Sequence, residues 1–117
     1  MPNSSQPLYR MKADFFKTLG HPVRIRVLEL LSEHERTVSD MLGEVGIEPS
    51  NLSQQLSVLR RAGLVTARRD GLFVTYALAS PRVSELLAVA REILLGVVVS
   101  QAETLGEIDE NPIKERL

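Results

Sequence analysis

Residues 49–71 read PSNLSQQLSVLRRAGLVTARRDG, and this stretch carries the clearest indications of the fold. Leucines recur at helical spacing after Pro49, and proline is well tolerated at the first position of a helix. Gly63 ends that pattern, and a strand-like run follows. The run stops at Asp70-Gly71, a dipeptide that strongly favours a β-hairpin turn. The stretch therefore predicts a helix followed directly by a hairpin.

Two helices are predicted at the start of the chain. Apolar residues at three- and four-residue spacing predict the first over about residues 8–19. The pair His21-Pro22 begins a second helix, which has one apolar face. Residues 33–36 are uniformly polar, and we expect them to form a loop.

The remaining elements complete a winged helix-turn-helix. Thr37 is expected to cap a short third helix, with Asp40 as the acid of a capping box, and Gly46 supplies the turn to the next helix. Residues 72–78 predict the second strand of the hairpin, and a last long helix covers about residues 82–105. The predicted fold class is mainly α with a small β-hairpin, in the order α-α-α-α-β-β-α.

The length and composition indicate one small domain. The 117 residues are 44% hydrophobic and 25% charged, which is ordinary for a folded protein. We expect residues 1–7 to be a flexible tail, 8–105 to form the domain, and 106–117 to be an acidic tail. The sequence has no cysteine, no signal-peptide pattern and no membrane-length apolar stretch, so we expect a cytoplasmic protein without membrane partners.

Basic residues are concentrated in one segment, although the net charge is −1. Residues 49–82 contain five arginines and a single acidic residue. Arg60 and Arg61 lie two turns beyond the polar residues near the start of that helix, where it is expected to leave a DNA groove. Arg68 and Arg69 stand just before the hairpin tip. This is the charge distribution expected of a segment that contacts phosphate.

The helix after Pro49 also carries short hydrogen-bonding side chains near its N-terminal end. Asparagine and glutamine can pair with two atoms of adenine, and serine can bind a base edge or a phosphate. Because side chains alternate along a strand, we expect only one of Arg68 and Arg69 to contact DNA, and we expect removal of Arg68 to weaken binding to every sequence alike. The predicted DNA-binding residues are Pro49, Ser50, Asn51, Ser53, Gln54, Gln55, Arg60, Arg61, Arg68 and Arg69.

With this order of elements, three stretches resemble the ArsR/SmtB family of winged-helix repressors. They are LGHPVRIRVL at 19–28, SNLSQQLSVLRRAGLV at 50–65, and the hairpin tip RRDG at 68–71. The resemblance covers about residues 8–100. It implies a homodimer whose first and last helices form the interface, repression by occupying an inverted-repeat operator in double-stranded DNA, and release by an effector.

The last helix independently favours a dimer, because its apolar side is too wide for one small domain to cover. The predicted interface residues are Leu8, Met11, Phe15, Leu86, Leu87, Ala90, Ile93, Leu94 and Val97.

The sequence departs from family members that sense metals. The thiolate pair that those members carry at the start of the third helix falls on Thr37 and Ser39, which cannot replace a thiolate. Members with an interhelical zinc site use carboxylate and histidine pairs on the last helix, which here has no histidine. The two histidines, His21 and His34, are expected to be structural or exposed to solvent. We therefore expect no metal and no cofactor, and any small effector to bind without thiols.

Two other classes of function are less well supported. An enzyme is not expected, because the sequence has no cysteine nucleophile, no glycine-rich phosphate loop and no serine–histidine–acid set at a familiar spacing. The stronger alternative is a winged-helix module that binds another protein without sequence-specific DNA contact. The polar side of the helix after Pro49 favours DNA, because protein interfaces usually centre on aromatic and apolar anchors.

Overall fold

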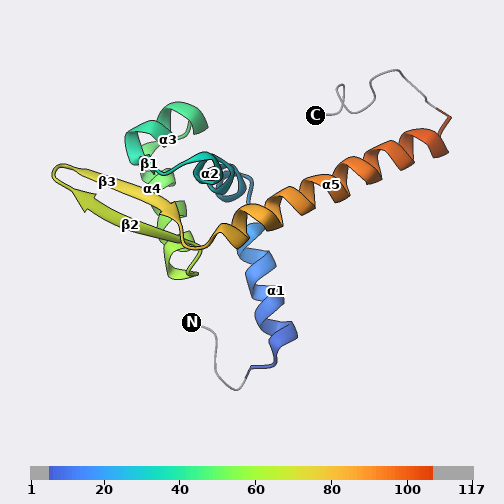
Figure 1. The fold of residues 1–117 in the computed structure, drawn as a ribbon, viewed down its shortest axis with the longest axis horizontal. Coiled ribbons are helices and arrows are strands. Elements are labelled where there is room, and N and C mark those ends of the chain that lie inside the picture. The colour runs from blue at the N-terminus through green and yellow to red at the C-terminus, as the bar shows by residue number, and fades with distance from the viewer. Residues whose placement is uncertain (1–5, 107–117) are drawn as a thin grey trace. The chain divides into compact units, whose positions relative to one another are not determined.

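The computed structural model describes residues 6–106, so most of the predicted N-terminal tail and all but one residue of the predicted C-terminal tail lie outside the described residues. The described part is mainly helical with a small three-stranded antiparallel sheet (Figure 1). Its elements are α1 (Leu8–Leu19), α2 (Pro22–Glu33), β1 (Arg36–Thr37), α3 (Val38–Val45), α4 (Pro49–Arg61), β2 (Val65–Asp70), β3 (Phe73–Leu78) and α5 (Pro81–Thr104).

The helix boundaries follow from local chemistry that the sequence displays. Pro22 is the first residue of α2, and the ring Nδ1 of His21 accepts a hydrogen bond from the backbone N–H of Val23 at 3.2 Å. Thr37 and Asp40 form the predicted capping box at the start of α3, with both hydrogen bonds at 3.2 Å. The predicted starts of both helices are confirmed.

Strand β1 was not expected, because residues 33–36 have the polar composition of a loop. The sheet order is β1-β3-β2, and Arg36 and Thr37 pair with the middle strand. The Arg36 side chain is 10% exposed and donates hydrogen bonds to the Leu30 carbonyl at 3.1 Å and to Glu33 at 2.7 Å. Two residues are too few to show an alternating pattern, so only tertiary pairing reveals this strand.

The hairpin turn lies one residue later than predicted. Asp70 pairs with Phe73 in the ladder, so the two turn residues are Gly71 and Leu72 rather than Asp70 and Gly71. Gly71 has a φ of 63°, and no described residue other than glycine has a positive φ. A two-residue turn with glycine first is the kind that matches the twist of the paired strands.

The described residues fall into two compact units, 6–84 and 85–106, and each is considered by itself. In the first unit, α2 packs against α3 and α4, and α4 also packs on β2. Its fully buried side chains come from these helices and are Val27, Leu28, Leu30, Met41, Leu52, Leu56 and Leu59. Burying each such leucine contributes about 1.5–3 kcal/mol, which holds α4 firmly on the domain.

The second unit contains, among the described residues, α5 from residue 85 onward. Its helix shows several exposed apolar side chains, including Ile93 and Leu94 at 61% and 63% exposure. No helix in the described part of the chain combines the length and the hydropathy that a membrane crossing requires.

Candidate nucleic-acid interface

Helices α3 and α4 form the helix-turn-helix. Gly46, with a φ of 70°, ends α3, and its N–H donates to the Leu42 carbonyl at 3.1 Å. Pro49 then occupies the first position of α4. Because α2 packs against both helices, their mutual geometry is set by the core of the first unit.

Helix α4 has one buried side and one exposed side. Leu52, Leu56 and Leu59 are at most 1% exposed. The exposed residues at the N-terminal end are uncharged, and they are Pro49, Ser50, Asn51, Ser53 and Gln54. The serine, asparagine and glutamine side chains of this set supply hydroxyl and amide groups on the surface of a helix that the core holds in place. This is the arrangement needed to contact base edges in the major groove.

Gln55 does not belong to this exposed set. The sequence pattern predicted it among the DNA-binding residues, and that prediction was wrong because the side chain is buried. It is only 6% exposed, and its side-chain oxygen accepts a hydrogen bond from Nε of Arg24 at 2.8 Å. Its amide nitrogen donates to Oδ1 of Asn51 at 3.0 Å. The partner on α2 lies 31 residues away in sequence, so the helical pattern alone could not show that a buried glutamine is satisfied there.

The arginines of α4 are exposed at its C-terminal end. Arg60 and Arg61 both lie in the last turn, and Nε of Arg61 donates to the Ser57 carbonyl at 3.4 Å. Ser57 is exposed as well, three residues after Gln54 and four before Arg61, and was not predicted as a site residue. Helical spacing places these three residues on one side of α4, and applying that spacing to the whole helix could have identified Ser57.

The two arginines of the hairpin, Arg68 and Arg69, differ in their side-chain partners. Arg68 bonds to Asp70 at 2.9 Å and reaches Glu35, before β1, with both terminal nitrogens at 3.1 and 3.3 Å. The alternation of side chains places Arg69 on the opposite face, which also carries the buried Val65. Within residues 6–106, the Arg69 side chain has no hydrogen bond or ion pair, and it is exposed.

These ion pairs change the titration of the groups they join. The hydrogen bond and charge of Arg68 lower the pKa of Glu35, and the two carboxylates together raise the pKa of Arg68. The Arg68 charge is therefore largely compensated by two nearby carboxylates, whereas the charge of Arg69 is not.

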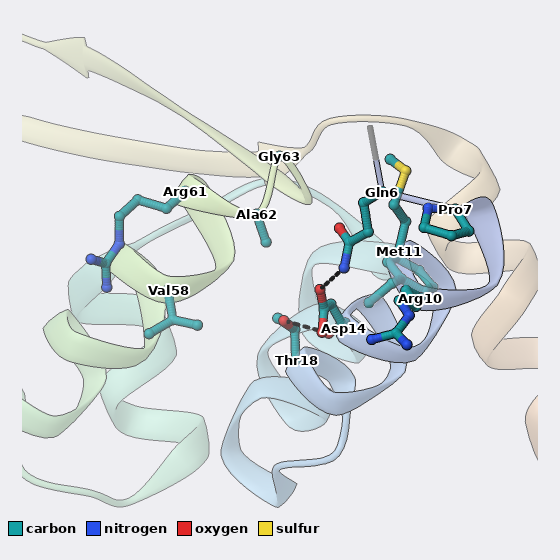
Figure 2. A pocket seen from close by; sticks show the side chains of 11 residues that line it. Gln6, Pro7, Arg10, Met11, Asp14, Thr18, Val58, Arg61, Ala62 and Gly63 are labelled. Carbon is teal, nitrogen blue, oxygen red and sulfur yellow. Dashed lines mark hydrogen bonds between the residues drawn. The ribbon is translucent and has the colours of Figure 1, made fainter. Parts of the chain in front are cut away.

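A groove of about 1100 Å³ lies between α1 and the last turns of α4 (Figure 2). On the α1 side, Asp14 accepts a hydrogen bond from Nε2 of Gln6 at 3.2 Å. On the α4 side, Val58 and Ala62 face the groove beside Arg61, so both walls combine apolar and polar side chains (Figure 2).

Three of the residues considered above as possible metal ligands take part in local hydrogen bonds. Thr37 and His21 cap helices, and Nδ1 of His34 lies 2.8 Å from the Glu35 carbonyl oxygen. Within residues 6–106, no three histidine, aspartate or glutamate side chains gather closely enough to hold a metal ion.

Apolar side chains are exposed on both helices of the predicted dimer interface. On α1, Leu8 is 64% exposed, and its neighbours Tyr9 and Phe16, which were not predicted for the interface, are also exposed. Met11 and Phe15 are half-buried. On α5, the exposed residues of the predicted set are Ala90, Ile93, Leu94 and Val97, and the half-buried ones are Leu86 and Leu87.

Comparison with known proteins agrees with this geometry. Residues 21–67 match the family described as "Bacterial regulatory protein, arsR family". The chain is 56% identical over 105 residues to the uncharacterized HTH-type transcriptional regulator Rv0081 of Mycobacterium tuberculosis, covering 89% of this chain and 92% of that protein. The crystal structure of Rv0081 superimposes with a TM-score of 0.79 at 58% identity, over 84% of this chain and 99% of that one.

Two further solved structures are similar. The transcriptional repressor BigR from Xylella fastidiosa has a TM-score of 0.68 at 35% identity, over 73% of this chain and 87% of its own. A homodimeric winged helix-turn-helix DNA-binding domain from Mycobacterium bovis, a possible ArsR-family regulator, has a TM-score of 0.68 at 30% identity, over 80% and 90%. The family and these relatives are transcriptional regulators rather than enzymes. With the winged helix-turn-helix fold and this degree of identity, the chain belongs to the ArsR family of bacterial transcriptional regulators.

Proposed function

We propose that this protein is a homodimeric repressor that binds an inverted-repeat operator in double-stranded DNA. The observation that carries the proposal is the exposed side of α4, where uncharged hydrogen-bonding side chains are followed by arginines. Base edges are recognised by such hydrogen-bonding groups, while arginines bind phosphate and set the position of the protein on the duplex.

The proposed contacts revise the set expected from the sequence. Gln55 is removed because it is buried, and Ser57 is added because it is exposed between Gln54 and Arg61. On the hairpin, Arg69 is kept as the phosphate-binding residue and Arg68 is removed, because the charge of Arg68 is already paired. The proposed DNA-binding residues are therefore Pro49, Ser50, Asn51, Ser53, Gln54, Ser57, Arg60, Arg61 and Arg69.

A second copy of the chain is proposed to cover the apolar side chains of α1 and α5. Exposed side chains such as Leu8, Ile93 and Leu94 are costly in water, and a two-fold interface would bury the same surface of both copies. The homodimeric domain from Mycobacterium bovis supports this arrangement by its similarity. A dimer also explains an inverted repeat, because two-fold protein symmetry requires two-fold symmetry in the site.

The groove between α1 and α4 is the proposed place for a small effector to act. One wall belongs to the last turns of α4, so a ligand in the groove contacts the DNA-contacting helix itself. A ligand that binds the DNA-free state more tightly than the DNA-bound state would release the operator.

Selection from random duplex DNA tests the proposal. Purified protein should enrich an inverted repeat whose half-sites are spaced by about one helical turn or a small multiple of it. The operator obtained then becomes the probe for effectors that release it. If no sequence is enriched even at low salt, the proposal fails, and a module that binds another protein becomes the better account.

A further inference from the structure

A chain of hydrogen bonds connects the end of α1 to the DNA-facing side of α4. Nη1 of Arg24 donates to the Thr18 carbonyl at 3.1 Å, and Nε of Arg24 donates to Oε1 of Gln55 at 2.8 Å. Nε2 of Gln55 then donates to Oδ1 of Asn51 at 3.0 Å. Gln55 is buried, whereas Asn51 is exposed in the first turn of α4.

Arg24 determines which groups donate and which accept along this series of hydrogen bonds. A guanidinium has five N–H donors and no acceptor, so Gln55 must turn its oxygen toward Arg24. The amide nitrogen of Gln55 then faces Asn51, and Asn51 must present its oxygen to it. The two N–H groups of the Asn51 amide are left pointing away from Gln55. The orientation of both amides is thus set by a residue that cannot accept a hydrogen bond.

We propose that Arg24 and Gln55 are positioning residues that make Asn51 a hydrogen-bond donor toward the major groove. Asn51 then requires an acceptor on the base that it contacts. Adenine and guanine offer N7, guanine also offers O6, and thymine offers O4, but cytosine offers only its N4 amino group, which is a donor. Because the Asn51 oxygen already accepts from Gln55, Asn51 therefore disfavours cytosine at one position of the operator. This inference rests on the proposed function, since it assumes that α4 contacts base edges.

The substitution Gln55→Glu tests the direction of the chain. The new carboxylate has nearly the same size and still accepts from Arg24, so the half-buried guanidinium keeps its partner. A carboxylate cannot donate to Asn51, so the Asn51 amide should turn its nitrogen inward and its oxygen toward the groove. Asn51 then needs a donor on the base, which adenine and cytosine provide through their amino groups and guanine and thymine do not.

The experiment uses the selected operator and the full chain. Asn51→Ala first identifies the base pair at which discrimination is lost. Binding is then measured to four duplexes that differ only at that base pair. The wild-type protein should reject one of the four, the duplex with cytosine on the contacted strand, by on the order of tenfold. Gln55→Glu should accept that duplex and disfavour the two with guanine or thymine on the same strand.

Matched variants separate this role from a general effect on α4. Gln101→Glu makes the same substitution at an exposed glutamine of α5, outside the proposed DNA-binding residues, and it should leave the order of the four duplexes at the Asn51 base pair unchanged. Arg24→Lys retains a residue that only donates and should keep the wild-type order. Arg24→Met removes the donor, so both amides can turn and the discrimination against cytosine should disappear. These two variants decide the question if Gln55→Glu does not fold.

The outcomes distinguish this inference from the proposed function. If the wild-type protein enriches an operator but tolerates cytosine at the Asn51 base pair, the inference is wrong and the proposed function stands. The same holds if Asn51→Ala affects no base pair, or if Gln55→Glu folds and keeps the wild-type order. If no operator is enriched at all, the proposed function fails and the inference fails with it.

Discussion

Gln54 and Gln55 are adjacent residues with the same side chain, and their environments give them different roles. Gln54 is exposed on the side of α4 that we propose to face DNA, whereas Gln55 is buried and bonded to Arg24 and Asn51. Arg68 and Arg69 on the hairpin form a second such pair, because one is held by carboxylates and the other is not. At the scale of single residues, the position of a side chain relative to the core decides its function.

Gln54→Ala tests direct contact with a base. Loss of a side chain that binds a base edge should cost about 1–3 kcal/mol and should relax selectivity at one base pair of each half-site. Selection from random DNA with the variant measures this, and Gln101→Ala, at an exposed glutamine of α5, is the matched control. An unchanged operator preference would show that Gln54 does not contact a base.

Arg69→Ala tests the assignment of the hairpin contact. Removing a phosphate contact should weaken binding to all sequences and reduce the slope of log affinity against log salt by about 0.9. Arg68→Ala should reduce the slope less, because Glu35 and Asp70 already compensate that charge. Titrations over a range of salt concentrations compare the two variants. A larger loss of slope for Arg68→Ala would restore the expectation drawn from the sequence.

At the scale of elements, local signals predicted those parts of the fold in which the residues involved are near one another in sequence. The capping box of α3 joins Thr37 and Asp40, three residues apart, and was found. Strand β1 pairs with residues about forty positions later and was missed. The Glu35–Arg68 ion pair joins the residue before β1 to strand β2, so the missed strand is also where the hairpin is braced.

Thr37→Ala tests the cap of α3. Loss of the hydroxyl that accepts from the Asp40 N–H should lower the free energy of unfolding by about 1 kcal/mol. Urea denaturation measures the change, and Ser39→Ala, which removes an exposed hydroxyl from the same turn, should have a smaller effect. Equal effects of the two substitutions would mean that the cap contributes nothing specific.

The same cap predicts a dependence on pH. Hydrogen bonds from Thr37 lower the pKa of Asp40 below its ordinary value of 3.8. Because the folded state has the lower pKa, the stabilisation is fully present above the ordinary value and is lost as the pH falls below it. The difference in stability between the wild-type protein and Asp40→Ala should therefore shrink in acid. A difference that stays constant below the ordinary pKa would contradict this role.

At the scale of the whole molecule, the exposed apolar residues of α1 and α5 form the surface that we propose a second copy to cover. A small domain buries a limited fraction of its surface, so a partner copy adds apolar contact that one chain cannot supply. Leu8, Phe16, Ile93 and Leu94 are all more than half exposed in the single chain.

Ile93→Glu tests the dimer. A charge at the centre of a buried apolar interface should convert the protein to a monomer, because an unpaired carboxylate is costly to bury. Sedimentation measures the mass, and Ala88→Glu adds the same charge on the other side of α5 by helical spacing and should leave the dimer intact. The monomeric variant should also bind the inverted repeat far more weakly than the wild-type dimer does. If Ile93→Glu has the same mass as the wild-type protein, α5 does not form part of the dimer interface.

The sequence by itself determined the order of the helices, the helix-turn-helix and the presence of the hairpin, because helix caps, glycine turns and apolar periodicity act between residues a few positions apart. It also identified Ser50, Asn51, Ser53 and Gln54 as exposed candidates for DNA contact. Only the tertiary structure decided that Gln55 is buried, that Arg68 rather than Arg69 is paired, and that β1 exists. Those outcomes depend on contacts between residues that lie about thirty or more positions apart, and chain folding alone brings such residues together.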